Sequence, residues 1–504
     1  MRESSGFVMK IKKLLENNDM GCVFAGPGDP AQIEITSIET DSRRCGKGAL
    51  FVCIEGYVED GHAYAAAAAE AGAAAILARS RDALEKYGFD QTRYKTAVLF
   101  CPDTRWGLSG VSAAFYGNPS RKLRLIGVTG TKGKTSTTYM MRAIYRAAGM
   151  ETGLVGTICN KIGEEELPAE RTTPEANILQ ELLSRMAEKK IGTCIMEVSS
   201  QGLHLNRVGH CRFGTAVFTN LSKDHIGANE HADMEEYAEA KSKLFTMCEN
   251  ALMNADSSYA GKMMEKAVRS GAKIYTFGID SACDFRAENI VMKQTGVEYD
   301  VAAGNAVYHL CVPSPGRFSV YNSLAAFACS YLEGIPPSTA AAGLKEVFVP
   351  GKAETVPTGR DFSVLIDYAH NPDSFINILT TVKEYAKRTV FLFGCGGDRN
   401  RPRALMGETA GKYADFTIIT SDNPRSEDPE SIVRDIEKGI IPTGADYICI
   451  VDRRSAIEYA LKNARPGDVI ILAGKGHETE QVLKDRTVPF DEREIVRGIL
   501  NTMK

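Results

Sequence analysis

The sequence lacks the cysteine patterns of a disulfide framework or a zinc module. Its 13 cysteines are an odd number, they are scattered along the chain, and none forms a Cys-x-x-Cys pair. Structural zinc sites and disulfide-rich domains need close, paired spacings. We therefore expect reduced thiols that are mostly buried as small apolar side chains.

An excess of charge of one sign is also missing. The formal net charge is −4, with 25% charged and 44% hydrophobic residues, which is typical of a soluble globular protein. A basic excess is what attracts a chain to nucleic acid or to anionic membranes. We expect neither partner, so any anionic ligand must be bound by local groups.

No stretch has the length and apolarity of a membrane span or a secretory leader. The first 20 residues mix both charge signs and contain no continuous apolar core. The Ala-rich segment 63–78 is interrupted by Glu70 and Gly72, and it is typical of a short helix that leads into a strand. We expect a cytoplasmic protein.

The chain contains no fixed-period repeat, and its 504 residues suggest about three domains. We place the boundaries near residues 100 and 346, which gives blocks 1–100, 101–346 and 347–504. In the last two blocks, short apolar runs alternate with amphipathic stretches. This alternation is typical of an α/β fold with a mostly parallel sheet.

A glycine-rich loop lies between an apparent strand and an apparent helix, in "LRLIGVTGTKGKTSTTYMM". Backbone N–H groups of such a loop cradle phosphates, a lysine reaches the β/γ phosphates, and a hydroxyl binds Mg²⁺. Val128 occupies the first glycine position of the usual motif. A glycine-rich turn without a ligand is the alternative, but the flanking elements favour ATP binding by residues 130–135, with Lys134 and Thr135 in these roles.

A lysine falls on the apolar stripe of the segment "DMEEYAEAKSKLF". Helical spacing places Lys241 on one face with Met234, Tyr237, Leu244 and Phe245, whereas Lys243 points elsewhere. Such a lysine commonly extends to water. A desolvated lysine instead has a lowered pKa and can act as a neutral amine, which can add CO₂ to become a carbamate.

Two further residues could share a metal ion with that carbamate. Glu197 ends "GTCIMEVSS" and His225 follows "GTAVFTNLSKDH", each just after an apparent strand. Oxygen ligands with one imidazole suit Mg²⁺ or Mn²⁺ better than zinc. Each residue alone could be an ordinary surface or loop residue, but their combination with a phosphate loop favours a metal site.

In the last block, four apolar runs end in polar or glycine-rich tails. The tails are "DYAHNP", "GCGGDR", "SDNPR" and "GKGHE". In open α/β sheets, ligands bind outside the carboxyl ends of the strands. Asp, Asn and Pro also build ordinary turns, but four such tails at one sheet edge favour a ligand site.

Ten segments in this order resemble the ATP-dependent Mur ligases, in particular the branch that adds a diamino acid to a UDP-linked dipeptide. They are "VTGTKGKTS", "RTTPEA", "MEVSSQGL", "TNLSKDH", "YAEAKSKLF", "GRFSVYNSLAA", "DYAHNPDS", "FGCGGDRNRPRALMG", "SDNPR" and "LAGKGHE". The front segment "TDSRRCGKGALFVCIEGYVEDGH" is similar to the family's UDP-binding domain. The likeness covers essentially the whole chain.

The resemblance implies three domains: a small α/β UDP-binding domain, a central P-loop ATPase domain and a Rossmann-like C-terminal domain. It implies that ATP phosphorylates the terminal carboxylate of UDP-MurNAc-L-Ala-D-Glu and that the amine of meso-2,6-diaminopimelate attacks the acyl phosphate. Mg²⁺ is the implied metal, and we expect a monomer. Because the three ligand sites lie on three blocks, we also expect domain closure.

The matching positions imply the following site residues. Lys134, Glu197, His225 and Lys241 are catalytic, and Thr135, Glu197, His225 and N6-carboxylated Lys241 bind metal. ATP contacts involve Gly130, Thr131, Lys132, Gly133, Lys134, Thr135, Asn322, Lys352 and Asp367. The UDP-linked substrate contacts Ser42, Thr172, Thr173, Ser199 and Arg207. The amino acid contacts Arg399, Asp422, Asn423, Pro424, Arg425, Gly474 and Glu478.

Diaminopimelate differs from lysine by a second carboxylate, for which Arg425 offers a planar fork. The sequence departs from the usual family pattern at Gln201, Leu205, Lys352 and residues 226–233. The alternatives are therefore a lysine-adding ligase, a divergent relative with another acceptor or amino acid, a folylpolyglutamate synthetase, and a P-loop regulatory protein. The front domain and "DNPR" argue against the folate enzyme, and a regulatory protein leaves "GCGGDR" and "GKGHE" without a role.

Overall fold

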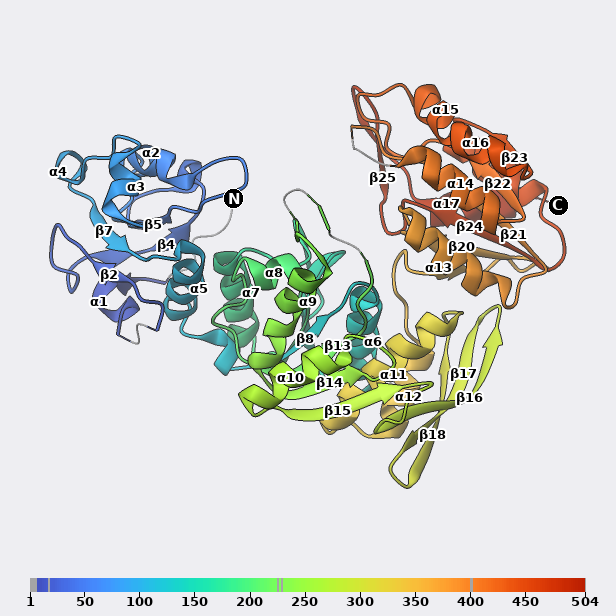
Figure 1. Ribbon diagram of the computed structural model, residues 1–504, viewed down its shortest axis with the longest axis horizontal. Helices are drawn as coiled ribbons and strands as arrows, with labels where there is room; N and C mark the ends of the chain where they lie inside the picture. Colours follow the sequence, from blue (N-terminus) through green and yellow to red (C-terminus); the bar gives the residue numbers. More distant parts are fainter. Residues whose placement is uncertain (1–6, 17–18, 224–225, 228–229, 399–401, 504) are drawn as a thin grey trace. The chain divides into compact units, whose positions relative to one another are not determined.

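The computed structural model describes residues 7–16, 19–223, 226–227, 230–398 and 402–503. Two compact units make up the chain, residues 1–138 with 149–277 and residues 139–148 with 278–504. Each unit is α/β (Figure 1). The proposed boundaries at residues 100 and 346 stay a prediction.

The first unit begins with a five-stranded sheet in the order β2-β7-β6-β5-β4. Strands β4 to β7 are parallel, and β2 pairs antiparallel with β7. The Ala-rich segment forms a helix that leads into a strand, as predicted. The elements are β1 (Met9–Lys10), α1 (Ile11–Leu14), β2 (Val23–Phe24), β3 (Glu34–Ile35), β4 (Ser37–Glu39), β5 (Ala49–Val52), α2 (Ala65–Glu70), β6 (Ala75–Ala78), α3 (Arg81–Glu85), α4 (Gln91–Tyr94), β7 (Ala97–Phe100) and α5 (Thr104–Phe115).

The same unit continues into a second sheet that is parallel at its centre. Its strands lie in the order β11-β10-β9-β12-β8-β13-β14-β15, and β9, β12, β8, β13, β14 and β15 run parallel. The elements are β8 (Arg124–Thr129), α6 (Lys134–Ala147, of which residues 139–147 are assigned to the second unit), β9 (Thr152–Val155), β10 (Cys159–Ile162), β11 (Glu165–Pro168), α7 (Ala176–Glu188), β12 (Thr193–Glu197), α8 (Ser200–His204), β13 (Phe213–Phe218), α9 (Met234–Ser242), β14 (Cys248–Asn254), α10 (Ala260–Ser270) and β15 (Lys273–Gly278).

The second unit contains an antiparallel set of strands, β16-β17-β18, and a six-stranded sheet in the order β19-β20-β24-β21-β22-β23. Its elements are β16 (Phe285–Lys293), β17 (Gly296–Ala303), β18 (Ala306–Val312), α11 (Arg317–Leu332), α12 (Pro337–Lys345), β19 (Glu354–Val356), β20 (Ser363–Asp367), α13 (Pro372–Lys383), β21 (Arg388–Phe393), α14 (Arg403–Tyr413), β22 (Phe416–Ile419), α15 (Pro429–Ile440), β23 (Tyr447–Cys449), α16 (Arg453–Lys462), β24 (Asp468–Ala473), β25 (Glu480–Val482), β26 (Thr487–Pro489) and α17 (Glu492–Thr502).

Burial explains why the six-stranded sheet has continuous apolar strands. All six residues of β24 are buried, because helices cover both faces of a parallel sheet. One face packs residues such as Phe375, Phe391 and Ile436, and the other packs Ile457, Leu461 and Val496. This packing fixes the carboxyl ends of β20, β24, β21 and β22 at one edge.

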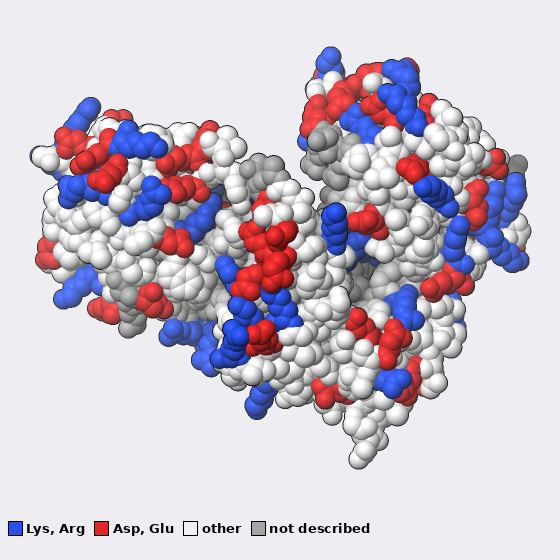
Figure 2. Space-filling model, viewed as in Figure 1, with Lys and Arg blue, Asp and Glu red and all other residues white. Residues whose placement is uncertain are grey.

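Surface and cysteine patterns agree with the sequence-based expectations. On the face drawn in Figure 2, Asp and Glu side chains lie among Lys and Arg side chains. All 13 cysteines are free, and most of them are buried. Within the described residues, every helix is too short or too polar to cross a bilayer.

Candidate functional site

The glycine-rich loop connects β8 to α6 in the first unit. Gly130 has φ +152°, and a Cβ at this position would lie 1.9 Å from Thr219 Oγ1, so only glycine fits. Asn220 Oδ1 accepts a hydrogen bond from Lys132 N at 3.0 Å. Lys134 Nζ donates to the carbonyl oxygens of Gly130 and Thr131 at 2.9 and 3.0 Å. The structure thus has the strand–loop–helix arrangement on which the prediction of phosphate binding depends.

Glu197 lies at the carboxyl end of β12, next to the first turn of α6. Its carboxylate accepts hydrogen bonds from Thr135 Oγ1 at 3.0 Å and from the N–H and Oγ1 of Thr157 at 2.9 and 3.0 Å. The residue is 1% exposed. The structure therefore brings two of the four predicted metal ligands together, and Thr157 is a neighbour that the sequence did not reveal.

Lys241 is buried on α9 and reaches the same loop. It is 1% exposed, its Nζ donates to the Gly130 carbonyl at 2.9 Å, and it lies over the Tyr237 ring. Lys243, two residues later, is exposed. The predicted burial of Lys241 and the opposite placement of Lys243 are confirmed, whereas His225 lies outside the described residues.

Three of the residues predicted to contact the UDP-linked substrate meet between β12 and α7. Thr173 Oγ1 accepts from Ser199 N at 3.0 Å, and Arg207 donates to the Thr173 carbonyl at 3.1 Å. Thr172 instead bonds Thr157 through the two hydroxyls. Ser42 begins a 3₁₀ turn after β4, and within the described part of the chain no hydrogen bond or ion pair joins it to this group.

The three predicted ATP contacts of the second unit lie on different elements. Asn322 is buried on α11, and Lys352 Nζ lies 4.8 Å from the centre of the Tyr368 ring. Asp367 ends β20 and accepts from the backbone N–H groups of Ala353 and Ala369 at 2.8 and 2.7 Å. This carboxylate therefore shapes the loops that flank the strand end.

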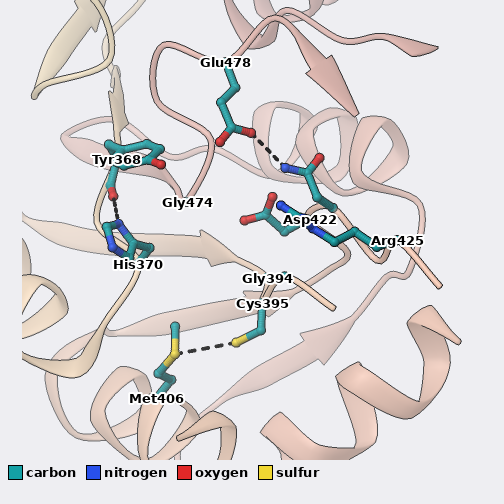
Figure 3. Close-up of a pocket in the computed structure, with 11 residues that line it drawn as sticks. Tyr368, His370, Gly394, Cys395, Met406, Asp422, Arg425, Gly474 and Glu478 are labelled. Atoms are coloured by element: carbon teal, nitrogen blue, oxygen red, sulfur yellow. Dashed lines mark hydrogen bonds between the residues drawn. The ribbon is translucent and has the colours of Figure 1, made fainter. Parts of the chain in front are cut away.

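All four polar tails of the second unit line one pocket, shown in Figure 3. Because β20, β24, β21 and β22 are parallel neighbours, their carboxyl ends meet at one edge. The predicted convergence is confirmed. The lining residues are Tyr368, His370, Gly394, Cys395, Gly396, Met406, Asp422, Asn423, Arg425, Gly474 and Glu478.

Acidic groups and one buried lysine form a network at the pocket wall. Asn423 Nδ2 donates to Glu478 Oε2 at 2.9 Å, and Lys475 Nζ donates to Asn423 Oδ1 and Glu478 Oε2 at 3.1 and 3.2 Å. Gly474 has φ +110°, and a Cβ there would lie 2.8 Å from Asp422 Oδ2. The glycine thus lets the chain pass close to the Asp422 carboxylate.

Burial raises the pKa of Asp422 above its ordinary value, although Arg453 and Lys475 lower it in part. Beneath it, the buried Arg453 donates to Glu492 and to the carbonyls of Ser421 and Ala473. This arginine therefore links the ends of β22 and β24 and holds the pocket floor in place.

Arg425 adopts a left-handed backbone conformation with φ +54°, and its N–H donates to the Val482 carbonyl at 3.1 Å. Its buried Nε has no hydrogen-bond partner among the described residues. A buried guanidinium nitrogen without a partner is a donor available to a ligand oxygen. Pro424 precedes it in the buried turn, and Arg399 lies outside the described residues.

Several residues of this pocket were not predicted from the sequence. Tyr368 and His370 stand in "DYAHNP" and Lys475 in "GKGHE", so the tails that predicted the site also contained them. Met406 comes from α14 and is not part of any strand tail. The packing of α14 against β22 and the contact of Met406 Sδ with Cys395 Sγ bring it to the pocket.

Comparison with known proteins gives one consistent result. Three sequence models match, described as "Mur ligase family, catalytic domain" over residues 34–101, "Mur ligase middle domain" over 128–330 and "Mur ligase, glutamate ligase domain" over 352–476. A UDP-N-acetylmuramoyl-L-alanyl-D-glutamate--2,6-diaminopimelate ligase from Caldanaerobacter subterraneus subsp. tengcongensis is 47% identical over 94% of this chain and 96% of its own length.

Two further matches carry the same name. The Clostridium botulinum protein is 43% identical over 93% of this chain and 95% of its own length. A solved structure of a UDP-N-acetylmuramoyl-L-alanyl-D-glutamate--2,6-diaminopimelate ligase is 28% identical, covers 98% of this chain and 99% of its own, and superposes with a TM-score of 0.72.

Proposed function

The chain belongs to the Mur ligase family, and from this premise we propose that it adds meso-2,6-diaminopimelate to UDP-MurNAc-L-Ala-D-Glu with hydrolysis of ATP to ADP. The observation that carries the amino-acid assignment is the pocket at the four strand ends. It combines the available guanidinium nitrogen of Arg425 with the carboxylates of Asp422 and Glu478. Such a site suits a ligand with two carboxylates and two ammonium groups.

The residues of the first unit suit the phosphoryl-transfer step. The loop N–H groups and Lys134 would hold the phosphates of ATP, and these fixed donors stabilise the charge that develops during transfer. Transfer of the γ-phosphoryl group to the D-Glu carboxylate gives an acyl phosphate and ADP. Thr173, Ser199 and Arg207 would hold the UDP-linked substrate so that its carboxylate faces the loop.

The donor set next to the loop fits Mg²⁺. Thr135 Oγ1 and Glu197 Oε2 are two oxygen atoms 3.0 Å apart, and the Glu197 carboxylate is buried, so both are of the ligand type that Mg²⁺ prefers. When bound, Mg²⁺ would neutralise phosphate charge. We also propose that Lys241 is carbamylated. The neutral amine would attack the carbon of CO₂, and one C=O π bond would open onto oxygen as the N–C bond forms. The nitrogen would then lose a proton to water, which leaves an anionic oxygen ligand.

The second unit would deliver the amine. Asp422 and Glu478 would hold an ammonium group of the amino acid, and Arg425 would hold the carboxylate at its far end. A deprotonated amine then attacks the acyl phosphate, and phosphate leaves from the tetrahedral intermediate. Because the reaction consumes ATP and a nucleotide-linked precursor, we place it in the cytoplasm, in peptidoglycan precursor synthesis.

ADP release tests the proposal. We expect ADP formation that requires both UDP-MurNAc-L-Ala-D-Glu and an amino acid, measured with a coupled ADP assay across a panel of amino acids. A protein that uses ATP as a regulatory switch would release ADP without either substrate, and this result would refute the ligase assignment.

The raised pKa of Asp422 predicts a pH dependence of amino-acid binding. An ordinary aspartate stays ionised down to about pH 4. Because burial raises the pKa of Asp422, it takes up its proton at a higher pH, and its contact with an ammonium group is lost as the pH falls through that raised value. The KM for the amino acid should therefore rise on the acidic side while the KM for ATP changes less.

The matched control for this pH dependence is Asp422→Asn. Its KM should be high at every pH and should lack the acidic rise, because asparagine does not titrate. The same acidic rise in wild type and variant would show that another group is responsible.

A further inference from the structure

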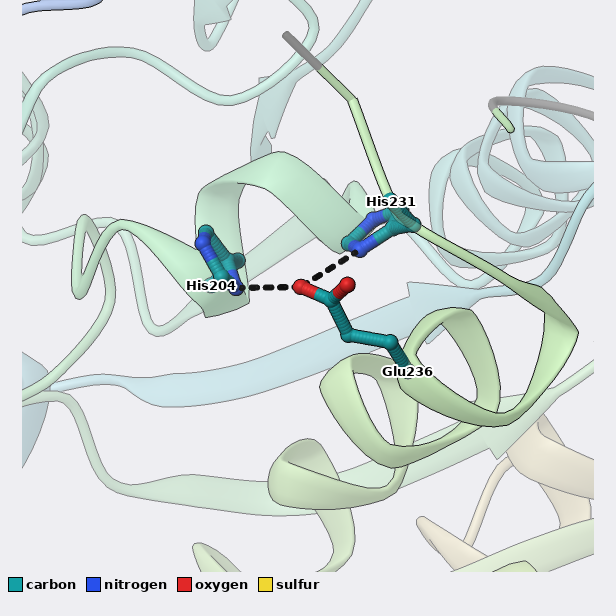
Figure 4. A group of neighbouring side chains, drawn as sticks. All are labelled: His204, His231 and Glu236. Atoms are coloured by element: carbon teal, nitrogen blue, oxygen red, sulfur yellow. Dashed lines mark ion pairs between the residues drawn. The ribbon is translucent and has the colours of Figure 1, made fainter. Parts of the chain in front are cut away.

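Three side chains of the first unit that have no part in the proposed reaction meet beside α9 (Figure 4). His204 is the last residue of α8, His231 precedes α9, and Glu236 lies in the first turn of α9. Glu236 Oε1 lies 3.7 Å from His204 Nδ1 and 3.8 Å from His231 Nδ1. One ligand atom from each residue falls within 4.8 Å of the other two.

His231 is fully buried, yet neither of its ring nitrogens has a hydrogen-bond partner among the described residues. Buried polar groups in folded proteins are almost always paired, so an imidazole in this state indicates a missing partner. Glu236 Oε2 is already used, because it accepts from Ala232 N at 2.8 Å. The other oxygen, Oε1, faces both histidines at a distance too long for a hydrogen bond.

A second group of similar composition shows the contrast. In the group of Glu55, Asp60 and His62, His62 Nδ1 lies 2.6 Å from Asp60 Oδ1 and Nε2 accepts from Arg79 N at 3.0 Å. Both ring nitrogens of this buried histidine are occupied by protein groups. His62 therefore has a structural role, whereas His231 lacks such partners within the described part of the chain.

We propose that His204, His231 and Glu236 bind a divalent transition-metal ion of the zinc class. Two ligands about 2.1 Å from a common ion at tetrahedral to trigonal angles are about 3.4–3.6 Å apart, close to the two separations found here. Two imidazoles and one carboxylate suit zinc and its neighbours better than Mg²⁺. A set of three protein ligands leaves one coordination position for water.

The position of this group gives the ion a structural consequence. The bound ion would join the end of α8 to the start of α9. The Tyr237 ring packs against His231, and its hydroxyl bonds Thr131 Oγ1 of the glycine-rich loop at 3.1 Å. The first turn of α8 adjoins Ser199 and Thr173. The ion would therefore hold the helix that carries Lys241 against the elements that bind the UDP-linked substrate.

Cobalt titration of the full-length protein tests this site. Co²⁺ is added without nucleotide and with excess Mg²⁺, so that the oxygen site at Thr135 and Glu197 is filled. We expect one Co²⁺ per chain with the visible absorption of a four-coordinate ion, no thiolate charge-transfer band, and displacement by Zn²⁺. Zn²⁺ should also raise the Tm.

His204→Ala is the main variant, because this side chain is partly exposed and its loss leaves the core intact. Its Co²⁺ affinity should fall at least about 10-fold and the Zn²⁺ effect on Tm should vanish. His309→Ala, at an exposed histidine of the second unit, should match the wild type. Glu197→Ala should also retain Co²⁺ binding. Equal Co²⁺ binding by wild type and His204→Ala, or loss of binding only in Glu197→Ala, would overturn the proposal.

Discussion

Replacement of Arg425 with alanine is expected to lower kcat/KM for meso-diaminopimelate by about 100-fold or more, with little change in the KM for ATP. Truncation of one partner of a buried, hydrogen-bonded charge pair costs about 2–5 kcal/mol. The structure supports the role, because Arg425 lines the pocket and its buried Nε has no partner among the described residues. The ATP loop lies in the other unit and shares no residue with this pocket.

Arg425→Lys is the matched control. Lysine keeps the charge but loses the planar fork, so its activity should fall between wild type and Arg425→Ala. The preference for diaminopimelate over lysine should be weaker in Arg425→Lys than in the wild type, and weakest in Arg425→Ala. If Arg425→Ala keeps the full preference for diaminopimelate, another group recognises the second carboxylate and the assignment of Arg425 is wrong.

Replacement of Lys241 with alanine is expected to reduce kcat by about 10²–10³-fold or more, on the scale seen when a fixed group at a developing charge is removed. Lys241 is buried and its Nζ donates to the Gly130 carbonyl at 2.9 Å, so its loss removes one of the two lysine donors to this carbonyl in the glycine-rich loop. It also removes the proposed carbamate. Steady-state ADP release measures the effect.

Lys243→Ala provides the control, because Lys243 is an exposed lysine two residues further along the chain. Its activity should stay close to wild type. A short-chain carboxylate such as propionate should partly restore Lys241→Ala and should not affect Lys243→Ala. NMR with isotope-labelled bicarbonate that detects no carbamate in the active wild type would refute the carbamate proposal, and the hydrogen bond to Gly130 and the contact with the Tyr237 ring would then account for the role of Lys241.

Periodic patterns explain what the sequence predicted. Helical spacing was enough to place Lys241 inside and Lys243 outside, because α9 keeps one buried face. The pocket was predictable from four strand tails, because parallel strands bring their carboxyl ends to one edge. Glu197 was predicted from its place at the end of an apparent strand, and Thr135 from the phosphate-loop motif.

Contacts between elements explain what the sequence did not predict. His204, His231 and Glu236 come from the end of one helix, a preceding segment and the start of another helix. No repeated spacing links them, and residues 226–233 were notable in the sequence only as a departure from the family pattern. Met406 and Thr157 likewise reach their sites through packing that a linear pattern does not encode.

A competition assay between the two diamino acids tests the proposed substrate of this ligase. The wild-type protein is given ATP, Mg²⁺, UDP-MurNAc-L-Ala-D-Glu and equal amounts of meso-diaminopimelate and L-lysine, and the products are identified by mass. We expect almost exclusively the diaminopimelate tripeptide, with one ADP per product, because lysine would leave Arg425 unpaired. Comparable amounts of the lysine product, or ADP without either tripeptide, would contradict it.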